Sequence, residues 1–268
     1  MGIQPVLMNL SAHMIPFRTS NLIKEKELHH YVERVNTGIP GLDEIIGGGF
    51  PKGTNILVCG SSGTGKTIFC TQFLQAGILN REPGIFITLE ERTTDLREEM
   101  LSLGWDLAQY ERSGELIIID AASSRINLPS TEEFRMGGGF DIDALVLEIH
   151  RAATKVDAKR LVIDSIPALE LKINEPAEFR KALFRLSSLL LEIGLTSLMT
   201  TESIDPFMIS RYGIEEFVAR GVIILSLEEE TADLRRFLRV RKMRGTSHLL
   251  RSIPFEITKN GIVLYVTK

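Results

Sequence analysis

The residues Gly60-Ser61-Ser62-Gly63-Thr64-Gly65-Lys66-Thr67 match the pattern G-x-x-x-x-G-K-[ST] at every fixed position. A short apolar run at residues 55–59 precedes them, and a helix-like segment at 66–78 follows them. In such a strand–loop–helix context, the N–H groups of the loop and the helix N-terminus cradle phosphate groups. We therefore predict a phosphate site in which Lys66 pairs with the β- and γ-phosphate oxygens and the Thr67 hydroxyl is a ligand of Mg²⁺.

Short apolar runs alternate with longer helix-like segments on both sides of this motif. The apolar runs are residues 55–59, 85–89, 116–120, 161–164 and 196–200. The segments between them are residues 66–78, 94–103, 141–154 and 178–193. Continuous apolar runs suit strands buried on both faces, and their alternation with helices predicts parallel β–α units. After Arg220 only strand-like runs remain, with a hairpin turn at residues 259–261. We predict an α/β fold, a mostly parallel sheet flanked by helices with a C-terminal antiparallel extension.

The composition excludes several classes of protein. The chain has 268 residues, with 31 Lys and Arg against 35 Asp and Glu, so its formal net charge is −4. This balance argues against a protein that coats duplex DNA through bulk charge. Two cysteines make no disulfide framework, and no apolar run reaches the roughly 18 residues of a membrane helix, so we expect a cytoplasmic protein. Residues 1–33 are predicted to be an N-terminal arm or leader, and residues 34–268 the folded domain.

Carboxylates at the ends of two apolar runs are candidates for the chemistry. Asp164 ends the run at 161–164 and is predicted to hold Mg²⁺ as the Walker-B residue, with Asp120 as its rival at the end of another run. Glu90 and Glu91 follow the run at 85–89, where adjacent carboxylates suit the activation of water, one raising the pKa of the other. Alternatively, the two glutamates are solvent-exposed residues just before the next helix, with no catalytic role.

Seven stretches together resemble the RecA-type ATPases of the KaiC group. They are TGIPGLDEIIGGGFPKG (37–53), the phosphate loop, the pair Glu90-Glu91, LVIDS (161–165), TTES (200–203), RYGIEEF (211–217) and KMRGTSH (242–248). The resemblance covers about residues 34–268, one copy of a domain that the clock protein of the group carries twice. It implies a RecA-like P-loop fold, slow Mg²⁺-dependent ATP hydrolysis and a homo-oligomeric ring, commonly a hexamer, with ATP between subunits.

The resemblance also implies roles for residues near the C-terminus. Glu90 and Glu91 match catalytic carboxylates, and Lys242 and Arg244 match cations that reach the γ-phosphate of the neighbour's nucleotide. Thr246 and His248 match positions near the base or ribose. Strand alternation gives a separate argument, because it puts Lys242 and Arg244 on the face of Leu238 and Val240, beyond the core. Glu202 is either a sensor of the nucleotide state or a plain surface carboxylate.

Two other functions stay open at this point. Autophosphorylation would need a Ser/Thr target; no evident matching pair is present, although Ser203 and Ser210 remain available. A recombinase-like filament on single-stranded DNA would need aromatic and basic loops, for which Arg125, Phe134, Arg135 and Phe140 are the candidates. The leading hypothesis is an ATP-hydrolysing ring whose nucleotide state controls assembly or the binding of an unidentified protein partner.

Overall fold

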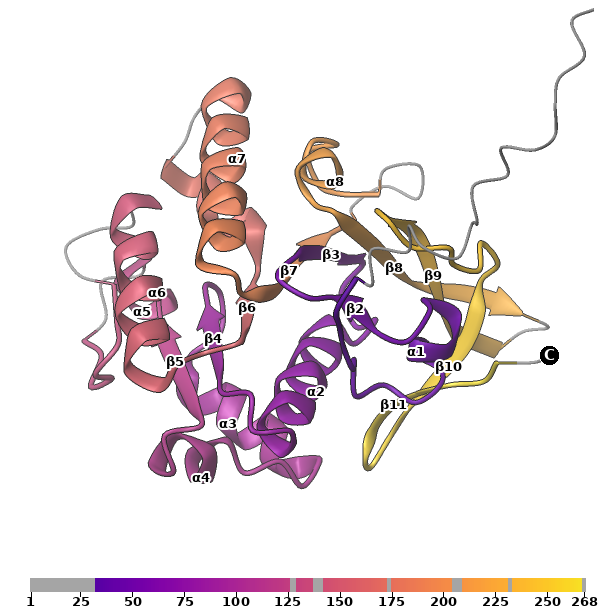
Figure 1. Ribbon diagram of the computed structural model, residues 1–268, viewed down its shortest axis with the longest axis horizontal. Coiled ribbons are helices and arrows are strands. Elements are labelled where there is room, and N and C mark those ends of the chain that lie inside the picture. Colours follow the sequence, from indigo (N-terminus) through magenta and orange to yellow (C-terminus); the bar gives the residue numbers. More distant parts are fainter. Residues whose placement is uncertain are drawn as a thin grey trace, which may run out of the picture. The chain divides into compact units, whose positions relative to one another are not determined.

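The strands predicted from the sequence gather in one mixed sheet (Figure 1). The computed structural model describes residues 32–125, 129–136, 142–172, 175–203, 209–230 and 233–266. Within these ranges the sheet has nine strands in the order β11-β10-β9-β8-β3-β7-β6-β4-β5. They are β3 (Asn55–Gly60), β4 (Gly84–Thr88), β5 (Leu116–Asp120), β6 (Arg160–Asp164), β7 (Thr196–Glu202), β8 (Gly221–Glu230), β9 (Asp233–Met243), β10 (Ile253–Thr258) and β11 (Gly261–Leu264).

The strand directions confirm the predicted α/β fold. All pairs from β8 to β5 are parallel, and β9, β10 and β11 continue the sheet antiparallel. One detail differs, because the strand after Arg220 was expected to belong to the antiparallel extension. That strand, β8, runs parallel to β3, with Gly221 opposite Ile56. The connection that contains the short helix α8 (Glu215–Val218) returns the chain to the edge where β3 starts, so the extension begins only at β9.

Helices contribute to two core clusters, one on each face of the parallel strands. Side chains of α2 (Lys66–Leu79), α3 (Thr93–Ser102) and α4 (Leu107–Arg112) lie in one cluster, and those of α6 (Ile142–Val156) and α7 (Pro176–Ile193) lie in the other. The central strand β3 serves both, because its side chains alternate between the two faces. The short helix α5 (Ala122–Arg125) follows β5, and the 3₁₀ helix η2 (Ile166–Lys172) follows β6.

A small ribbon precedes the main sheet in the chain. β1 (Arg34–Val35) pairs antiparallel with β2 (Phe50–Pro51), and α1 (Leu42–Ile45) lies between them in sequence. Val35, Leu42 and Phe50 are buried in the same core cluster as α2. Glu33–Lys268 forms one compact unit. Nearly all of the predicted arm lies outside the described residues, so that boundary stays a prediction. Among the described residues, no helix has both the length and the apolar character needed to cross a membrane.

Candidate functional site

The predicted phosphate loop lies at the carboxyl end of β3 and leads directly into α2. Two of its glycines are required by close approach. A Cβ on Gly60 would lie 2.5 Å from the Leu225 carbonyl oxygen, and Gly65 has a φ of +97° with the Ile257 side chain against it. The Lys66 ammonium folds over the loop and donates to the carbonyl oxygens of Gly60 (2.8 Å) and Ser61 (3.0 Å). The loop thus has the shape and charge of a phosphate cradle.

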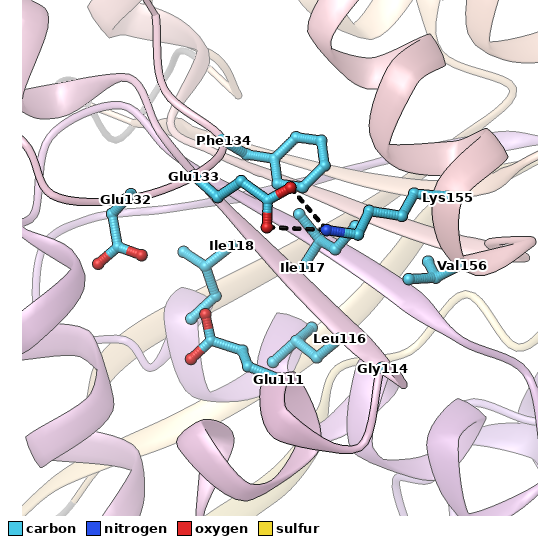
Figure 2. Close-up of a pocket in the computed structure, with 10 residues that line it drawn as sticks. All are labelled: Glu111, Gly114, Leu116, Ile117, Ile118, Glu132, Glu133, Phe134, Lys155 and Val156. Atoms are coloured by element: carbon cyan, nitrogen blue, oxygen red, sulfur yellow. Dashed lines mark hydrogen bonds and ion pairs between the residues drawn. The ribbon is translucent and has the colours of Figure 1, made fainter.

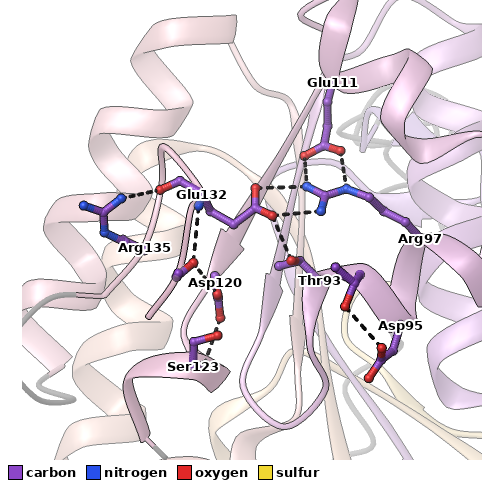
Figure 3. A network of polar contacts seen from close by, with 10 residues as sticks. Thr93, Asp95, Arg97, Glu111, Asp120, Ser123, Glu132 and Arg135 are labelled. Carbon is purple, nitrogen blue, oxygen red and sulfur yellow. Dashed lines mark hydrogen bonds and ion pairs between the residues drawn. The ribbon is translucent and has the colours of Figure 1, made fainter. Parts of the chain in front are cut away.

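Asp164 lies beside the phosphate loop, and its rival does not. The Thr67 hydroxyl donates to Asp164 Oδ2 at 2.7 Å, and the Thr200 hydroxyl donates to Asp164 Oδ1. Asp120 ends β5, the outermost strand on that side of the sheet, and accepts hydrogen bonds from the backbone N–H of Ser123 (2.9 Å) and the hydroxyl of Ser130 (2.6 Å). Asp120 therefore holds a local turn (Figure 3).

The pair formed by Thr67 and Asp164 fits a Mg²⁺ ion. Both offer hard oxygen donors, and their 2.7 Å contact lies at the mouth of the phosphate loop. Mg²⁺ is usually held by one or two carboxylates together with substrate phosphates and water, not by a cage of protein ligands. The described part of the chain contains no group of three or more His, Cys, Asp or Glu side chains that could hold a metal alone.

The two adjacent glutamates after β4 lie in different environments. Glu90 is exposed, lines the cleft and accepts a hydrogen bond from the Ser165 hydroxyl at 2.7 Å. Glu91 is half-buried, and burial raises its pKa to about 7, with help from the negative charges of Glu99 and Asp164. We expected the adjacent glutamate to raise the pKa. Instead, burial and the negative charge of Glu99, a residue of α3, raise the pKa of Glu91.

These side chains surround one cleft of about 370 Å³. Burial lowers the pKa of Lys66 within it, although Asp164 and Glu202 act in the opposite direction. Glu202, at the end of β7, lines the cleft and lies 3.7 Å from the Arg211 guanidinium. The full lining is Ser62, Gly63, Gly65, Lys66, Thr67, Ile68, Glu90, Glu99, Asp164, Ser165, Glu202, Arg236 and Ile257.

Sequence reasoning did not assign five of the lining residues to the site, and Arg236 matters most among them. The five are Ile68, Glu99, Ser165, Arg236 and Ile257. The Arg236 guanidinium donates to the Gly63 carbonyl oxygen at 3.2 Å, so a second cation of the same chain reaches the phosphate loop. The sequence did contain a signal for Arg236, because alternate residues of a strand share a face and Arg236 therefore lies on the same face as Leu238 and Val240. Glu99 and Ile257 gave no such signal, because only tertiary packing brings α3 and β10 to the cleft.

A bulge in β9 shows that the shared-face argument for Lys242 was wrong. Val222 pairs with Lys242 and Ile223 pairs with Val240, so Arg241 is an extra residue on β9. Beyond it, Met243 takes the buried side with Leu238, and Lys242 lies on the opposite face. There the Lys242 ammonium donates to the carbonyl oxygens of Glu216 (3.0 Å) and Ala219 (2.6 Å), and burial lowers its pKa.

The four residues predicted to serve a neighbour lie away from the cleft of their own chain. None of Lys242, Arg244, Thr246 and His248 is among its lining. Arg244 is exposed, and its backbone N–H donates to the carbonyl oxygen of Arg220. The backbone N–H of Arg220 in turn donates to the carbonyl oxygen of Asn55 at the start of β3. The phosphate loop follows the other end of β3, five residues or roughly 16 Å along the strand. Lys242 and Arg244 therefore lie near the amino-terminal ends of the parallel strands, whereas the phosphate loop lies at their carboxyl ends.

A second, smaller pocket of about 120 Å³ lies beside β5. Figure 2 shows the ion pair between Lys155 and Glu133 (2.6 Å) at this pocket. Nearby, Arg97 of α3 contacts both Glu111 (2.7 Å) and Glu132 (2.8 Å), as Figure 3 shows. These contacts join α3 and α4 to residues 129–136, and none of them reaches the phosphate loop.

The aromatic and basic loop considered for single-stranded DNA does not present a stacking surface where it is described. Phe134 is buried, with Arg151 (4.3 Å) and Lys155 (5.1 Å) over its ring. Arg135 donates to the carbonyl of Glu132 in its own loop. Phe140 lies outside the described residues.

Comparison with known proteins gives one consistent result. A family model described as "ATPase: KaiC" matches residues 35–268. The circadian clock oscillator protein KaiC of Synechococcus elongatus is 42% identical over 239 residues, which cover 88% of this chain and 45% of that protein. The circadian clock protein KaiC3 of Synechocystis is 40% identical and covers 87% and 46%. The chain thus spans about half the length of these curated relatives. The crystal structure of the KaiC-like protein PH0186 from Pyrococcus horikoshii matches with a TM-score of 0.76 and 47% identity, over 88% of this chain and all of that one.

Proposed function

The chain belongs to the KaiC family of ATPases, and on that premise we propose that it is a slow, Mg²⁺-dependent ATPase that works as a homo-oligomeric ring, commonly a hexamer. ATP lies between subunits, and its state gates assembly or the binding of a protein partner. One observation carries this proposal: the cations lie at opposite ends of the parallel strands. Lys66 and Arg236 lie at the carboxyl ends, beside the phosphate loop, and Lys242 and Arg244 lie near the amino-terminal ends.

The phosphate loop accounts for binding of the triphosphate. Its N–H groups and the start of α2 favour the β-phosphate, and Lys66 moves from the Gly60 and Ser61 carbonyls to phosphate oxygens. Thr67 and Asp164 would hold Mg²⁺, which when bound neutralises charge on the phosphates. The Arg236 guanidinium at Gly63 adds positive charge beside the same phosphates.

Glu90 and Glu91 have different roles in hydrolysis: Glu90 orients the attacking water, and Glu91 exchanges a proton. The Ser165 hydroxyl orients Glu90, whose side chain faces the cleft and can orient an attacking water. Glu91, with a pKa near 7, exchanges a proton at neutral pH without a large cost.

Neither alternative function has an observation that favours it. The Ser210 side chain is fully buried and donates to the Glu216 carboxylate, so its hydroxyl is not presented for phosphorylation. Phe134 and Arg135 are engaged within their own chain.

Both cysteines are buried and free, which agrees with the proposed cytoplasmic location.

Mixing two inactive variants tests the shared site. Arg244→Ala removes the cation at one edge, and Lys66→Ala removes the cation at the other, so each pure ring should lose hydrolysis. A fully committed trans arginine contributes roughly 10³- to 10⁵-fold to turnover. A mixed interface joins an intact phosphate loop to an intact Arg244, and phosphate release should return with a maximum near equal ratios. Arg241→Ala, an exposed cation at the bulge, is the matched control and should keep parental activity.

The interpretation of the mixing experiment depends on proof of co-assembly. Native mass measurements of the mixture, with the two variants labelled to differ in mass, show whether mixed rings form. Mixed rings that release no phosphate at any ratio would refute the shared site, because every mixed ring contains complete interfaces.

A further inference from the structure

Arg34 on the ribbon strand β1 holds the loop that carries Arg244 and Thr246. Its guanidinium donates to the Thr246 hydroxyl at 2.9 Å, and also to the carbonyl oxygens of Ile46 (3.0 Å) and Gly49 (2.8 Å). Residues 34 and 246 are separated by 212 positions in the chain, so the contact joins the first described strand to the turn after β9. Neither the predicted catalytic set nor the cleft lining includes Arg34.

A glycine turn shapes the site in which the Arg34 guanidinium lies. Gly49 has a φ of +116°, and a Cβ there would lie 2.2 Å from the Val35 carbonyl oxygen, so only glycine fits. A Cβ on Gly47 would lie 3.9 Å from both the Arg34 guanidinium carbon and the Thr246 methyl group. The turn thus brings two carbonyl oxygens and one hydroxyl within reach of a single planar cation, which suits the fork of an arginine better than a lysine.

The chemistry of this contact fixes the direction of the Thr246 hydroxyl. A guanidinium has five N–H donors and no acceptor, so the Thr246 oxygen must accept the hydrogen bond. A hydroxyl has a single proton to donate, and within the described residues that proton has no acceptor. Arg34 therefore leaves Thr246 as a hydrogen-bond donor, held one residue beyond Gly245 and two beyond the exposed Arg244.

We propose that Arg34 is a positioning residue for the nucleotide of the adjoining subunit: it holds loop 244–248 and presents the Thr246 hydroxyl as a donor to an acceptor atom on the ribose or base. This rests on the proposed ring, because the loop lies at the sheet edge opposite the phosphate loop of its own chain. The loop has a second attachment, since the Leu249 N–H donates to the Ile45 carbonyl at 3.2 Å. Loss of the Thr246 hydroxyl therefore leaves the loop attached to the ribbon.

Two threonine substitutions isolate the hydroxyl. Thr246→Val keeps the shape and removes the donor, whereas Thr246→Ser keeps the donor. A neutral hydrogen bond made equally to bound ATP and to the transition state should raise KM by roughly 2- to 12-fold with kcat nearly unchanged. We expect that KM increase for Thr246→Val and a parental KM for Thr246→Ser. A parental KM for Thr246→Val would overturn the proposal.

Arg34→Met tests the residue that acts through this hydroxyl. Its KM should rise at least as much as that of Thr246→Val, and the double variant should equal Arg34→Met alone, because both changes remove one interaction. Lys52→Met is the matched control, because Lys52 follows the same ribbon and its side chain forms an exposed ion pair with Glu33, and its KM should stay parental. A double variant whose KM increase is the product of the two single increases would contradict the proposal.

Mixed rings show on which side of the interface Arg34 acts. Added Lys66→Ala subunits carry an intact Arg34 and Thr246, so they should return the KM of Arg34→Met sites towards the parental value. Added Arg244→Ala subunits should leave the KM raised, because only interfaces with an intact Arg244 turn over, and in that mixture those come from Arg34→Met subunits. Should Arg34→Met fail to fold by circular dichroism, Thr246→Val takes its place in both mixtures.

The two proposals fail in different ways in these mixtures. If Arg244→Ala and Lys66→Ala subunits restore hydrolysis together while Lys66→Ala leaves the KM of Arg34→Met raised, the positioning role is wrong and the ring stands. If co-assembled Arg244→Ala and Lys66→Ala subunits restore nothing, the shared site itself is wrong, and the role of Arg34 towards a neighbour is wrong with it.

Discussion

Glu91→Gln should stabilise the fold at alkaline pH while it impairs hydrolysis. The Glu91 carboxylate is half-buried near the negative charges of Glu99, Asp164 and Asp95, and its pKa is raised from 4.5 to about 7. Below pH 4.5 the group is protonated in both the folded and unfolded states, so it costs nothing. Between pH 4.5 and about 7 the unfolded state loses this proton while the folded state keeps it, so the free energy of unfolding falls across this range and levels off above pH 7, where the group is charged in both states.

The size of this effect follows from the two pKa values. A change from 4.5 to about 7 would correspond to about 3 kcal/mol if the carboxylate were fully shielded from solvent. Because Glu91 is only half-buried, screening by water reduces the figure to about 1–2 kcal/mol. Glutamine has nearly the same shape and no charge at any pH. The variant should therefore match the parent near pH 4.5 and exceed its stability by about 1–2 kcal/mol at pH 8.

Urea unfolding of the nucleotide-free and metal-free protein at pH 5, 6, 7 and 8 measures this difference. Dilute protein keeps subunit association from adding to the apparent stability. Glu98→Gln, an exposed carboxylate on α3, the helix that follows Glu91, is the control, and its difference from the parent should stay within about 0.5 kcal/mol at every pH. A constant difference between Glu91→Gln and the parent from pH 5 to pH 8 would show that Glu91 does not titrate near neutrality in the fold.

Three further variants test other parts of the structure. Lys66→Ala should bind Mg-ATP far more weakly with its circular dichroism unchanged, and a parental affinity in a titration would remove Lys66 from the site. Glu90→Gln combined with Glu91→Gln should still bind ATP but release no phosphate, whereas release at the parental rate would place the base elsewhere. Gly77→Ala should lower the Tm although alanine favours helices, because the new Cβ would lie 2.4 Å from the side chain of the buried Arg160. Overpacking costs about 1–3 kcal/mol, and a raised Tm in a thermal melt would contradict this account.

Local sequence signals predicted the centre of the fold and the phosphate loop. The run at residues 85–89 is nearly continuous in apolar residues because β4 is buried on both faces, and the same holds for β3 and β5. The phosphate loop is a local motif whose glycines are required by its own backbone, as Gly65 shows. The place of Asp164 beside Thr67 also followed, because the carboxyl ends of parallel strands meet at one edge of the sheet.

The rest depended on contacts between distant parts of the chain. Alternation along β9 gives the right face for Arg236, Leu238 and Val240, but one extra residue at Arg241 reverses it before Lys242. Nothing in the local pattern marks that bulge, which fits the register with β8. Glu99 likewise has the exposed position of an ordinary surface glutamate on its helix, and only the packing of α3 brings it to the cleft.

The structure separates the two cations that were predicted to act together on a neighbour. An ammonium has three donors, and Lys242 uses two of them on the carbonyls of Glu216 and Ala219, at the end of α8. At most one donor remains for a phosphate, and loss of the side chain would leave two carbonyls without their partner. Arg244 is exposed in the turn after β9, and its side chain forms no hydrogen bond or ion pair with the described residues. A loss of activity in a Lys242 variant therefore mixes folding with catalysis, whereas an Arg244 variant tests the proposed contact with the neighbour's phosphate without breaking these two hydrogen bonds.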